Sequence, residues 1–425
     1  MHVQIPYGST QLSISVPEDA TILRSRHVPP LEDERAAFLA SLRAPLGSAP
    51  LRELVKAQDR VAIVISDITR PTPNERIVPW LLEELSFVPR SQFVILNGTG
   101  SHRANTREEL IRMLGEEIVA SVEIVNHDAF APATLVELGT TASGVPVWVN
   151  RRYIEADVRI VTGFIEPHFF AGFSGGAKGI IPGLAGIQTI QALHNAPLIG
   201  DQRSTWAVLA DNPVQQGIQE AVRLCPPEFM TNVTLDQERH ITGVFSGHYI
   251  QAHYEGCTAV ARMATQAVDE RFDIVITSNN GYPLDQNLYQ SVKGMTAAAQ
   301  IVRQGGAIVT VAECRDGLPE HGNFKELLRM RESPAALLHL INTPDFQMHD
   351  QWQVQKQALV QLQADVYLYS SLPDEVVRAA QLLPAPELQA TIDALLQQFG
   401  PAARVAVLPE GPVMVPYVAE RSYVS

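Results

Sequence analysis

The most constraining feature of the sequence is a regular alternation of short β-branched runs with helical patterns. The runs are RVAIVISD (60–67), QFVILNG (92–98), SVEIVNHD (121–128) and DVRIVTG (157–163). Amphipathic patterns such as NERIVPWLLEEL and TREELIRML follow two of them. Strands that alternate with helices predict an α/β fold with a mainly parallel, doubly wound sheet.

A second series of the same kind begins near residue 272. DIVITS, GGAIVTVAE and ADVYLYSS are predicted strands, and LDQNLYQSVKGMTAAAQIV is a predicted helix between the first two. Because 425 residues exceed what one hydrophobic core usually spans, we predict two α/β domains, 1–268 and a smaller one at 272–386, with the active site in the cleft between them. The closing run ARVAVLPEGPVMVPYV could join either domain, and we assign 390–425 to the larger one. MHVQI and QLSISV, on either side of Tyr7-Gly8-Ser9, predict an N-terminal β-hairpin.

Charge and cysteine usage exclude several classes of protein. The chain has 46 acidic and 32 basic residues, a formal charge of −14, and no Lys/Arg-rich block, so binding to nucleic acid or to an anionic membrane is disfavoured. Cys225, Cys257 and Cys314 are scattered and form no C-x-x-C pair, which argues against a disulfide framework or a thiolate metal site. No apolar stretch reaches the roughly 18 residues of a membrane span and the N-terminus lacks a signal pattern, so we expect a soluble cytoplasmic protein.

Polar clusters follow three of the predicted strands. SDITRP contains Asp67, Thr69 and Arg70, GTGSHR contains His102, and Glu166-Pro167-His168 follows the fourth strand. In open α/β sheets, ligands bind just beyond the carboxyl ends of the strands. The three clusters are therefore expected to converge on one crevice, which we predict to be the active site.

The segment GFSGGAKG (172–179) places Lys178 within a glycine loop. It departs from the phosphate-binding P-loop, because Ala177 replaces the second glycine and Gly179 replaces the hydroxyl residue that would hold magnesium. A phosphate could still approach backbone N–H groups of closely spaced glycines. A lysine among apolar neighbours tends to lose its proton, which suits covalent attachment of a carbonyl-type group. The alternative is a flexible turn that carries a surface lysine.

His168 and His194 flank this lysine, and the chain has no H-E-x-x-H or similar zinc spacing. Either histidine could be a structural residue. A metal held by one histidine would need its other ligands from elsewhere, and a cofactor could supply them. His102, at a strand-to-helix turn, is either functional or simply close to the capping box of Thr106 and Glu109.

Four further residues have both a functional and a structural interpretation. Arg70 precedes Pro71 and could clamp a carboxylate, or could form a surface pair with Asp67. Gln290 and Lys293 share one face of a predicted helix, which could equally be a solvated face. Trp352, in HDQWQ, could serve packing alone.

Taken together and in this order, SDITRP, GTGSHR, EPHFFAGFSGGAKGIIPG, the later LH, YQSVKGM and DQW resemble the landmarks of the nickel-dependent lactate racemase family over nearly the whole chain. The resemblance implies two α/β domains and a nickel-pincer nucleotide, which is pyridinium-3-thioamide-5-thiocarboxylic acid mononucleotide carrying nickel. It also implies a role for each landmark residue: Lys178 as the covalent tether, His194 as the nickel ligand, His102 and His168 as the acid/base pair, Arg70, Gln290, Lys293 and Trp352 as substrate-binding residues, and Asp67 and Thr69 as cofactor contacts.

The family chemistry is inversion of a 2-hydroxy acid at C2 by reversible hydride transfer. Abstraction of the α-proton would place a carbanion beside a carboxylate, and a general base supplies only about 10²- to 10⁴-fold of the 10⁶-fold or more that enzymes commonly need. The substrate implied is lactate or a related small or sugar-derived 2-hydroxy acid, and enzymes for cofactor synthesis and nickel insertion are the implied partners. Two alternatives stay open: a non-catalytic nucleotide-cofactor binding protein, which could dispense with His102 and His168, and a P-loop-like nucleotide-dependent enzyme.

Overall fold

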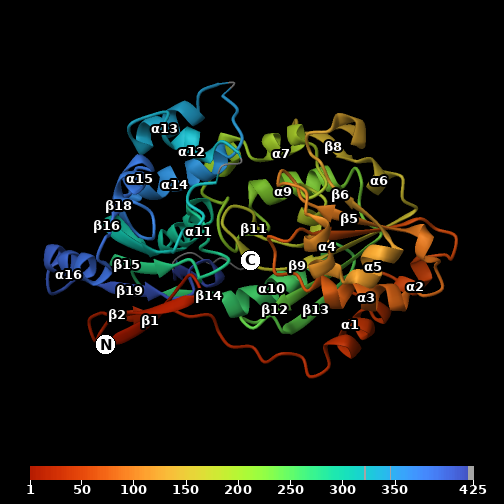
Figure 1. The fold of residues 1–425 in the computed structure, drawn as a ribbon, viewed down its shortest axis with the longest axis horizontal. Helices are drawn as coiled ribbons and strands as arrows, with labels where there is room; N and C mark the ends of the chain where they lie inside the picture. The colour runs from red at the N-terminus through yellow and green to blue at the C-terminus, as the bar shows by residue number, and fades with distance from the viewer. Residues whose placement is uncertain (320–321, 345, 420–425) are drawn as a thin grey trace.

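The computed structural model describes residues 1–319, 322–344 and 346–419, which form two α/β lobes side by side (Figure 1). The first lobe is built on a six-stranded sheet of order β13-β12-β9-β4-β5-β6. Its strands are β4 (Val61–Ser66), β5 (Phe93–Gly98), β6 (Glu123–Asn126), β9 (Val158–Phe164), β12 (Phe229–Leu235) and β13 (Ile241–Gly247). All neighbours are parallel except β13, which is an antiparallel edge strand. The four predicted strands and the mainly parallel sheet are confirmed.

Both faces of this sheet are covered by helices, which explains why its strands are continuous apolar runs. Ile63 and Ile65 of β4 face a core shared with α1 (Glu34–Arg43), α3 (Asn74–Glu84) and α4 (Arg107–Leu114). Ala62 and Val64 face the opposite core, which includes α7 (Ile187–Leu193) and α9 (Pro213–Val222). Successive side chains of a strand point to opposite faces, so one run of six residues supplies both cores.

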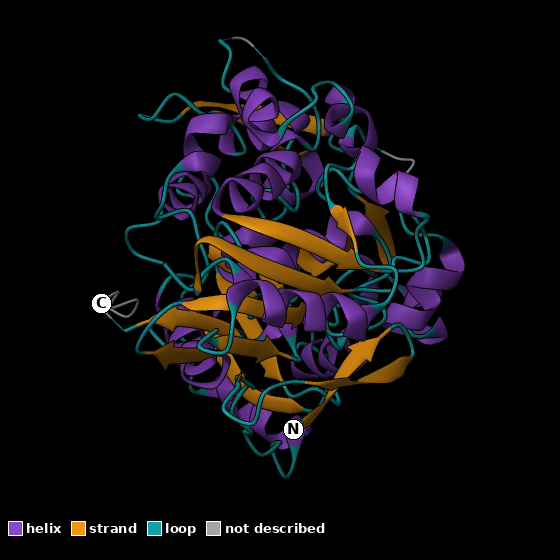
Figure 2. Cartoon of the chain, turned by 90° about the vertical axis from the view of Figure 1, so that its left-hand side faces the viewer, coloured by secondary structure: helices purple, strands orange, loops and turns teal. Residues whose placement is uncertain are grey.

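The second lobe, on the left of Figure 1, faces the viewer in Figure 2. It is built on a parallel sheet of order β18-β17-β16-β15-β19-β3. Its strands are β3 (Thr21–Ile22), β15 (Phe272–Ser278), β16 (Val302–Val311), β17 (Ala364–Tyr369), β18 (Leu383–Pro384) and β19 (Val405–Leu408). Helices α11 (Leu288–Ala298) and α14 (Gln351–Gln363) share the core on one face, and α16 (Leu388–Phe399) lies on the other. The predicted second β–α series is therefore present.

The assignment of 390–425 to the larger domain is wrong for most of that segment. β19 is fully buried in the second sheet, where it pairs with β15 and β3, and α16 packs on the same sheet. The predicted N-terminal hairpin, β1 (His2–Tyr7) and β2 (Thr10–Ser15), forms as expected but also packs against the second sheet. Within the described part of this segment, which ends at residue 419, β20 (Val415–Val418) reaches back to pair with β14 (Thr265–Val268).

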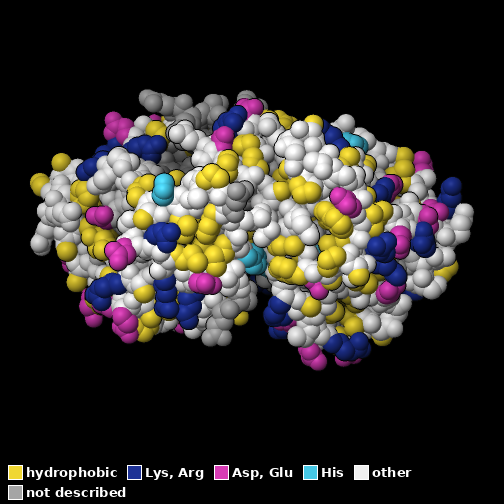
Figure 3. All heavy atoms as spheres, turned by 90° about the horizontal axis from the view of Figure 1, so that it is seen from above, with side chains coloured by type: hydrophobic (Ala, Val, Ile, Leu, Met, Phe, Trp, Pro, Cys, Tyr) yellow, Lys and Arg dark blue, Asp and Glu magenta, His cyan; other side chains and the backbone are white. Residues whose placement is uncertain are grey.

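The remaining helices and strands connect and cap these layers. They are α2 (Leu51–Leu54), α5 (Glu116–Ser121), β7 (Leu135–Thr140), β8 (Pro146–Asn150), α6 (Arg151–Ile154), β10 (Pro167–His168), β11 (Gly172–Phe173), α8 (Ala196–Gly200), α10 (Gln251–Ala264), α12 (Phe324–Leu328), α13 (Pro334–Ile341) and α15 (Asp374–Ala379). No helix among the described residues is long and apolar enough to cross a membrane. Seen from above, the surface narrows to a waist between the lobes, and charges of both signs are interspersed over this face (Figure 3).

Candidate active site

The polar segments that follow β4, β5 and β9 meet at one edge of the first sheet, as predicted from the sequence. A cavity of about 120 Å³ lies at this edge, and its lining includes Asp67, Arg70, His102 and Lys178. The three segments are brought together because parallel neighbouring strands end on the same side of the sheet.

His102 is oriented by a buried carboxylate. Its Nδ1 lies 2.8 Å from Asp67 Oδ2, while the hydroxyl of Thr69 donates to the other oxygen of Asp67 at 2.6 Å. Burial of Asp67 opposes ionisation, but the hydrogen bonds from His102 and Thr69 prevail and lower the pKa of this carboxyl. An ionised Asp67 accepts the Nδ1 proton of His102, which leaves Nε2 available to take a proton from a ligand.

Glycines shape the loop that carries Lys178. Gly175 and Gly176 have φ of 77° and 56°, a region that side chains rarely adopt. The N–H of Gly176 donates to Asn232 Oδ1 at 2.6 Å, and a Cβ at Gly176 would lie 2.6 Å from the ring of His253. A larger residue at position 176 would therefore displace the short 3-10 turn Gly176–Gly179 that contains the lysine.

The amine of Lys178 lies in a poorly solvated and cationic environment. Burial lowers the pKa of Lys178 from its ordinary value of 10.5 to about 7, with a further contribution from Arg70 and a partial offset from Glu166. Near neutral pH a much larger share of this amine is therefore neutral than of an ordinary lysine. The amine is thus suited to act as a nucleophile near neutral pH.

The ring of Phe170 connects the lysine with the two histidines that flank it in the sequence. Lys178 Nζ lies 5.7 Å from the centre of this ring, and the ring centres of His168 and His194 lie 4.4 and 5.2 Å from it. Three groups that are up to 26 positions apart in the chain therefore surround one aromatic side chain.

His168 is buried and stays neutral. Burial, together with the positive charges of Lys178 and Arg70, lowers the pKa of His168 well below its ordinary value. Its Nδ1 accepts a hydrogen bond from the N–H of Ala171 at 3.2 Å, which favours the tautomer with the proton on Nε2.

A hydrogen bond to the backbone fixes the ring of His194. Its Nδ1 lies 2.7 Å from the carbonyl oxygen of Ile190, so Nδ1 donates the proton and Nε2 keeps a free lone pair. Burial, reinforced by Lys178, lowers the pKa of His194 to about 3, so the ring is neutral. Within residues 1–319, 322–344 and 346–419, no three His, Cys, Asp or Glu side chains gather in a way that could hold a metal ion. A metal at His194 would therefore depend on donors that the described part of the protein does not supply.

The second lobe contributes a cation and an aromatic wall to the same site. Lys293, on α11, has its pKa lowered to about 8 by burial and by Arg70, with Glu166 opposing the shift. The ring of Trp352 lies 4.8 Å from that of His194, and its Nε1 donates to the hydroxyl of Tyr289 at 3.2 Å. Gln290 lies in the first turn of α11, one turn before Lys293.

Arg70 does not pair with Asp67, which was the structural alternative for this arginine. Its Nη1 donates instead to Glu166 Oε1 at 2.9 Å, which ties the segment after β4 to the segment after β9. Sequence reasoning noted Glu166 at the end of its strand but gave it no role.

Two other residues of the site were also given no role. His349, three positions before Trp352, lies 3.2 Å from the hydroxyl of Ser101 and so joins the two lobes beside His102. Tyr289 stands directly before Gln290 in the YQSVKGM motif, and this position was the available signal for it.

Both lobes of this chain match known proteins in sequence. Models of the lactate racemase N-terminal and C-terminal domains match residues 7–207 and 268–415. Lactate racemase from Thermoanaerobacterium thermosaccharolyticum is 34% identical over 417 residues, which cover 96% of this chain and 98% of that protein. Lactate racemase from Lactiplantibacillus plantarum is 38% identical over 382 residues, which cover 89% of this chain and 90% of that protein.

Solved structures agree with this match. The lactate racemase apoprotein from T. thermosaccharolyticum superposes with a TM-score of 0.92 at 34% identity and covers 98% of this chain and 100% of its own. A protein from Thermotoga maritima superposes with a TM-score of 0.70 at 20% identity, covering 90% of this chain and 98% of its own, and supports the fold alone.

Proposed function

The chain belongs to the lactate racemase family and is therefore an isomerase, and we propose that it inverts the C2 configuration of lactate or of a related small or sugar-derived 2-hydroxy acid. One observation carries the proposal. Lys178, His168 and His194 surround Phe170, and His102 lines the same cavity as Lys178. A neutral amine, a neutral ligating imidazole and two imidazoles for proton transfer are the groups that this reaction requires.

We propose that the family's nickel-pincer nucleotide is attached covalently at Lys178, with His194 as the protein's nickel ligand. The lowered pKa of Lys178 supports the tether, and the free Nε2 of His194 supports ligation. Asp67 and Thr69 line or border the cavity where the cofactor would lie. When bound, the cofactor supplies an electron-poor ring that can accept a hydride from C2 and return it to either face.

The protein's own cations would hold the substrate carboxylate. Arg70 has five N–H donors, of which one is paired with Glu166, so a second edge of its guanidinium remains for the substrate. Lys293 reaches the same region from the second lobe, and Gln290 lies one turn away on the same helix. A carboxylate bound here would also offset the repulsion between the positive charges of Lys293 and Arg70.

Two histidines would move the hydroxyl proton. The enantiomers present their hydroxyl groups differently to one fixed carboxylate site, so a base is needed on either side. His102, oriented by Asp67, would serve one enantiomer through its free Nε2. His168 would serve the other once its Nδ1 gives up the hydrogen bond from Ala171 and carries the ring proton, which leaves Nε2 free to accept. Trp352 and Phe170 would exclude water from the reacting carbon.

The experiment uses protein produced together with the cofactor-synthesis and nickel-insertion enzymes. Enantiopure L- and D-lactate are incubated with it in deuterium oxide, followed by chiral analysis and mass spectrometry of the product. We expect inversion without deuterium at C2, because a returned hydride does not exchange with solvent. Deuterium at C2 would instead indicate proton abstraction and would contradict the mechanism.

Variants test the residues separately from the substrate. Lys178→Ala is expected to show no cofactor adduct by intact-mass spectrometry. His102→Gln is expected to keep the adduct and to lose at least about 10²-fold in kcat, the usual contribution of an acid/base group. Loaded Lys178→Ala protein with normal turnover would refute the tether.

A further inference from the structure

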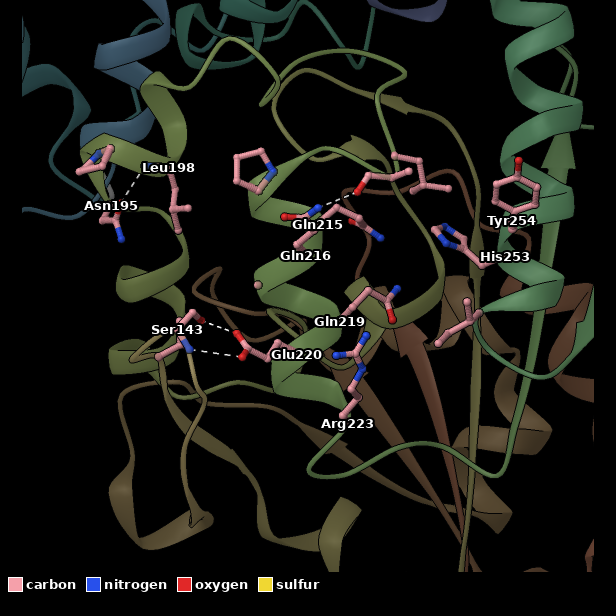
Figure 4. Close-up of a pocket in the computed structure, with 17 residues that line it drawn as sticks. Ser143, Asn195, Leu198, Gln215, Gln216, Gln219, Glu220, Arg223, His253 and Tyr254 are labelled. Carbon is pink, nitrogen blue, oxygen red and sulfur yellow. Dashed lines mark hydrogen bonds between the residues drawn. The ribbon is translucent and has the colours of Figure 1, made fainter. Parts of the chain in front are cut away.

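A second and larger pocket lies in the first lobe, between α9 and the start of α10 (Figure 4). Its volume is about 890 Å³, within the roughly 300–1,000 Å³ of sites for small organic ligands. The segment that contains Leu198 and Leu209 covers it, and Ile250 and Tyr254 of the α10 end line its other side. None of the residues assigned above to the racemase site lines this pocket.

His253 forms the wall between this pocket and the lysine loop. It lines the pocket, while its Nε2 lies 2.8 Å from the carbonyl oxygen of Ser174 and its ring packs against Gly176. Ser174 in turn lines the cavity that contains Lys178. The two sites therefore lie back to back and do not share a chamber.

The face of α9 in this pocket carries buried amides without partners. Gln215 is 2% exposed, and neither its Oε1 nor its Nε2 makes a hydrogen bond within the described chain. Oε1 of Gln219, one helical turn later, is also buried without a partner among the described residues. By contrast, the amide of neighbouring Gln216 donates to the carbonyl oxygen of Ala210 at 2.8 Å. These amide atoms have almost no accessible surface, so a ligand in the pocket would pair with them only once the two side chains turn toward it. Buried amide groups are nearly always paired, which favours such a turn when a ligand is present.

Arg223 follows Gln215 and Gln219 along the same side of the chain toward the surface, and the three residues are called the α9 row below. Arg223 stands one turn beyond Gln219, and its guanidinium points back toward the pocket (Figure 4). The side chain of Arg223 is exposed, and the nearby carboxylate of Glu220 is engaged by the backbone N–H and hydroxyl of Ser143. From Gln215 to Arg223 the helix rises about 12 Å, at 1.5 Å per residue.

We propose that this pocket binds a nucleoside monophosphate. A glutamine carboxamide presents a donor and an acceptor side by side, which match the adjacent donor and acceptor on a nucleobase edge. Leu198, Leu209 and Ile250 offer apolar contact for the faces of the base, and Tyr254 at the rim offers a stacking surface. Arg223 at the outer end of the α9 row binds the phosphate, in the bidentate manner typical of arginine.

Isothermal titration calorimetry of the full chain with AMP, GMP and UMP, each beside its nucleoside, tests this proposal. At least one nucleotide is expected to bind, and its nucleoside at least tenfold more weakly. Gln215→Met keeps the volume of the side chain but removes the amide, and it is expected to weaken nucleotide binding at least tenfold. Arg223→Gln is expected to remove the preference for the phosphate. Gln251→Met, an exposed change on α10 outside the pocket, serves as the matched control and should bind as the wild type does.

Three results would overturn the proposal: no binding of any of the nucleotides, equal affinity in wild type and Gln215→Met, or binding that is lost in Lys178→Ala but retained in Gln215→Met. The last result would place the nucleotide in the interdomain cleft. Thermal unfolding measurements show whether each variant is folded. If Gln215→Met does not fold, Arg223→Gln, a change at an exposed residue, tests whether the pocket binds the nucleotide. Because these readouts are independent of racemisation, the pocket and the proposed function can fail separately.

Discussion

Replacement of Lys178 by methionine is expected to stabilise the cofactor-free protein at neutral pH. The folded state lowers the pKa of this amine from 10.5 to about 7, so the unfolded chain binds the proton more tightly than the folded chain does. Each unit of difference corresponds to about 1.4 kcal/mol, which sets an upper bound near 5 kcal/mol for the cost of the lysine below pH 7. Since Lys178 keeps partial contact with solvent, we expect about 1–3 kcal/mol for the variant.

The sign of the pH dependence distinguishes this explanation from a simple gain in packing. Above pH 10.5 the amine is neutral in both states and its cost is absent, and the cost grows as the pH falls toward 7, below which it is constant. The free energy of unfolding, from urea titrations between pH 6 and 9.5, should therefore show the largest advantage for Lys178→Met at pH 6–7 and a shrinking advantage at higher pH.

An exposed lysine provides the control for this experiment. Lys325→Met on α12 should change stability by less than about 0.5 kcal/mol at every pH. The reasoning is refuted if Lys178→Met is no more stable than the wild type at pH 7, or if its advantage is the same at pH 9.5 as at pH 6.

Three further predictions concern the site in the loaded enzyme. His194→Ala should keep the covalent adduct by intact mass but lose most of its nickel by elemental analysis, because we propose the free Nε2 as the protein's nickel donor; full nickel content would disprove that role. Asp67→Asn should load normally and lower kcat by about 10²-fold or more, since an amide no longer selects the Nδ1–H tautomer of His102, and unchanged kcat would contradict the orientation. His349→Phe removes the hydrogen bond to Ser101 between the lobes and should raise KM more than it lowers kcat, as measured by initial rates; the opposite split would place His349 in the chemical step.

The strands of the fold were predictable where burial on both faces leaves a continuous apolar run. Such runs mark β4, β5, β9 and β15, and the structure has each of them within two residues of the predicted bounds. The run at β19 is equally clear, but its sequence does not encode which strand it pairs with. It lies beside β15, which is more than 120 residues earlier in the chain, and only the packed second sheet decides that pairing.

The site was predictable at the level of segments rather than contacts. The rule that parallel strands end at one edge predicted that Asp67, His102 and His168 converge. Asp67 and His102 line one cavity, and His168 lies near enough to Lys178 and Arg70, which also line it, for their charges to lower its pKa. The pair of Arg70 with Glu166 joins residues 96 positions apart, and no local pattern selects Glu166 over Asp67 as the partner. In the structure, Asp67 is already bonded to His102 and Thr69, which leaves Glu166 for the arginine.

The two proposed acid/base histidines have unlike surroundings, and thermodynamics limits how this difference can appear. His102 faces the Asp67 carboxylate, whereas burial and neighbouring cations disfavour the protonated form of His168. The direction of the reaction that needs a protonated His168 would therefore start from a minor state of the free enzyme. Enantiomers have equal free energies, so kcat/KM must be equal in both directions at every pH. The asymmetry can then appear only as parallel changes in kcat and KM. A substrate carboxylate bound near Arg70 and Lys293, as proposed, would reduce the asymmetry by offsetting the positive charge that, together with burial, keeps His168 neutral.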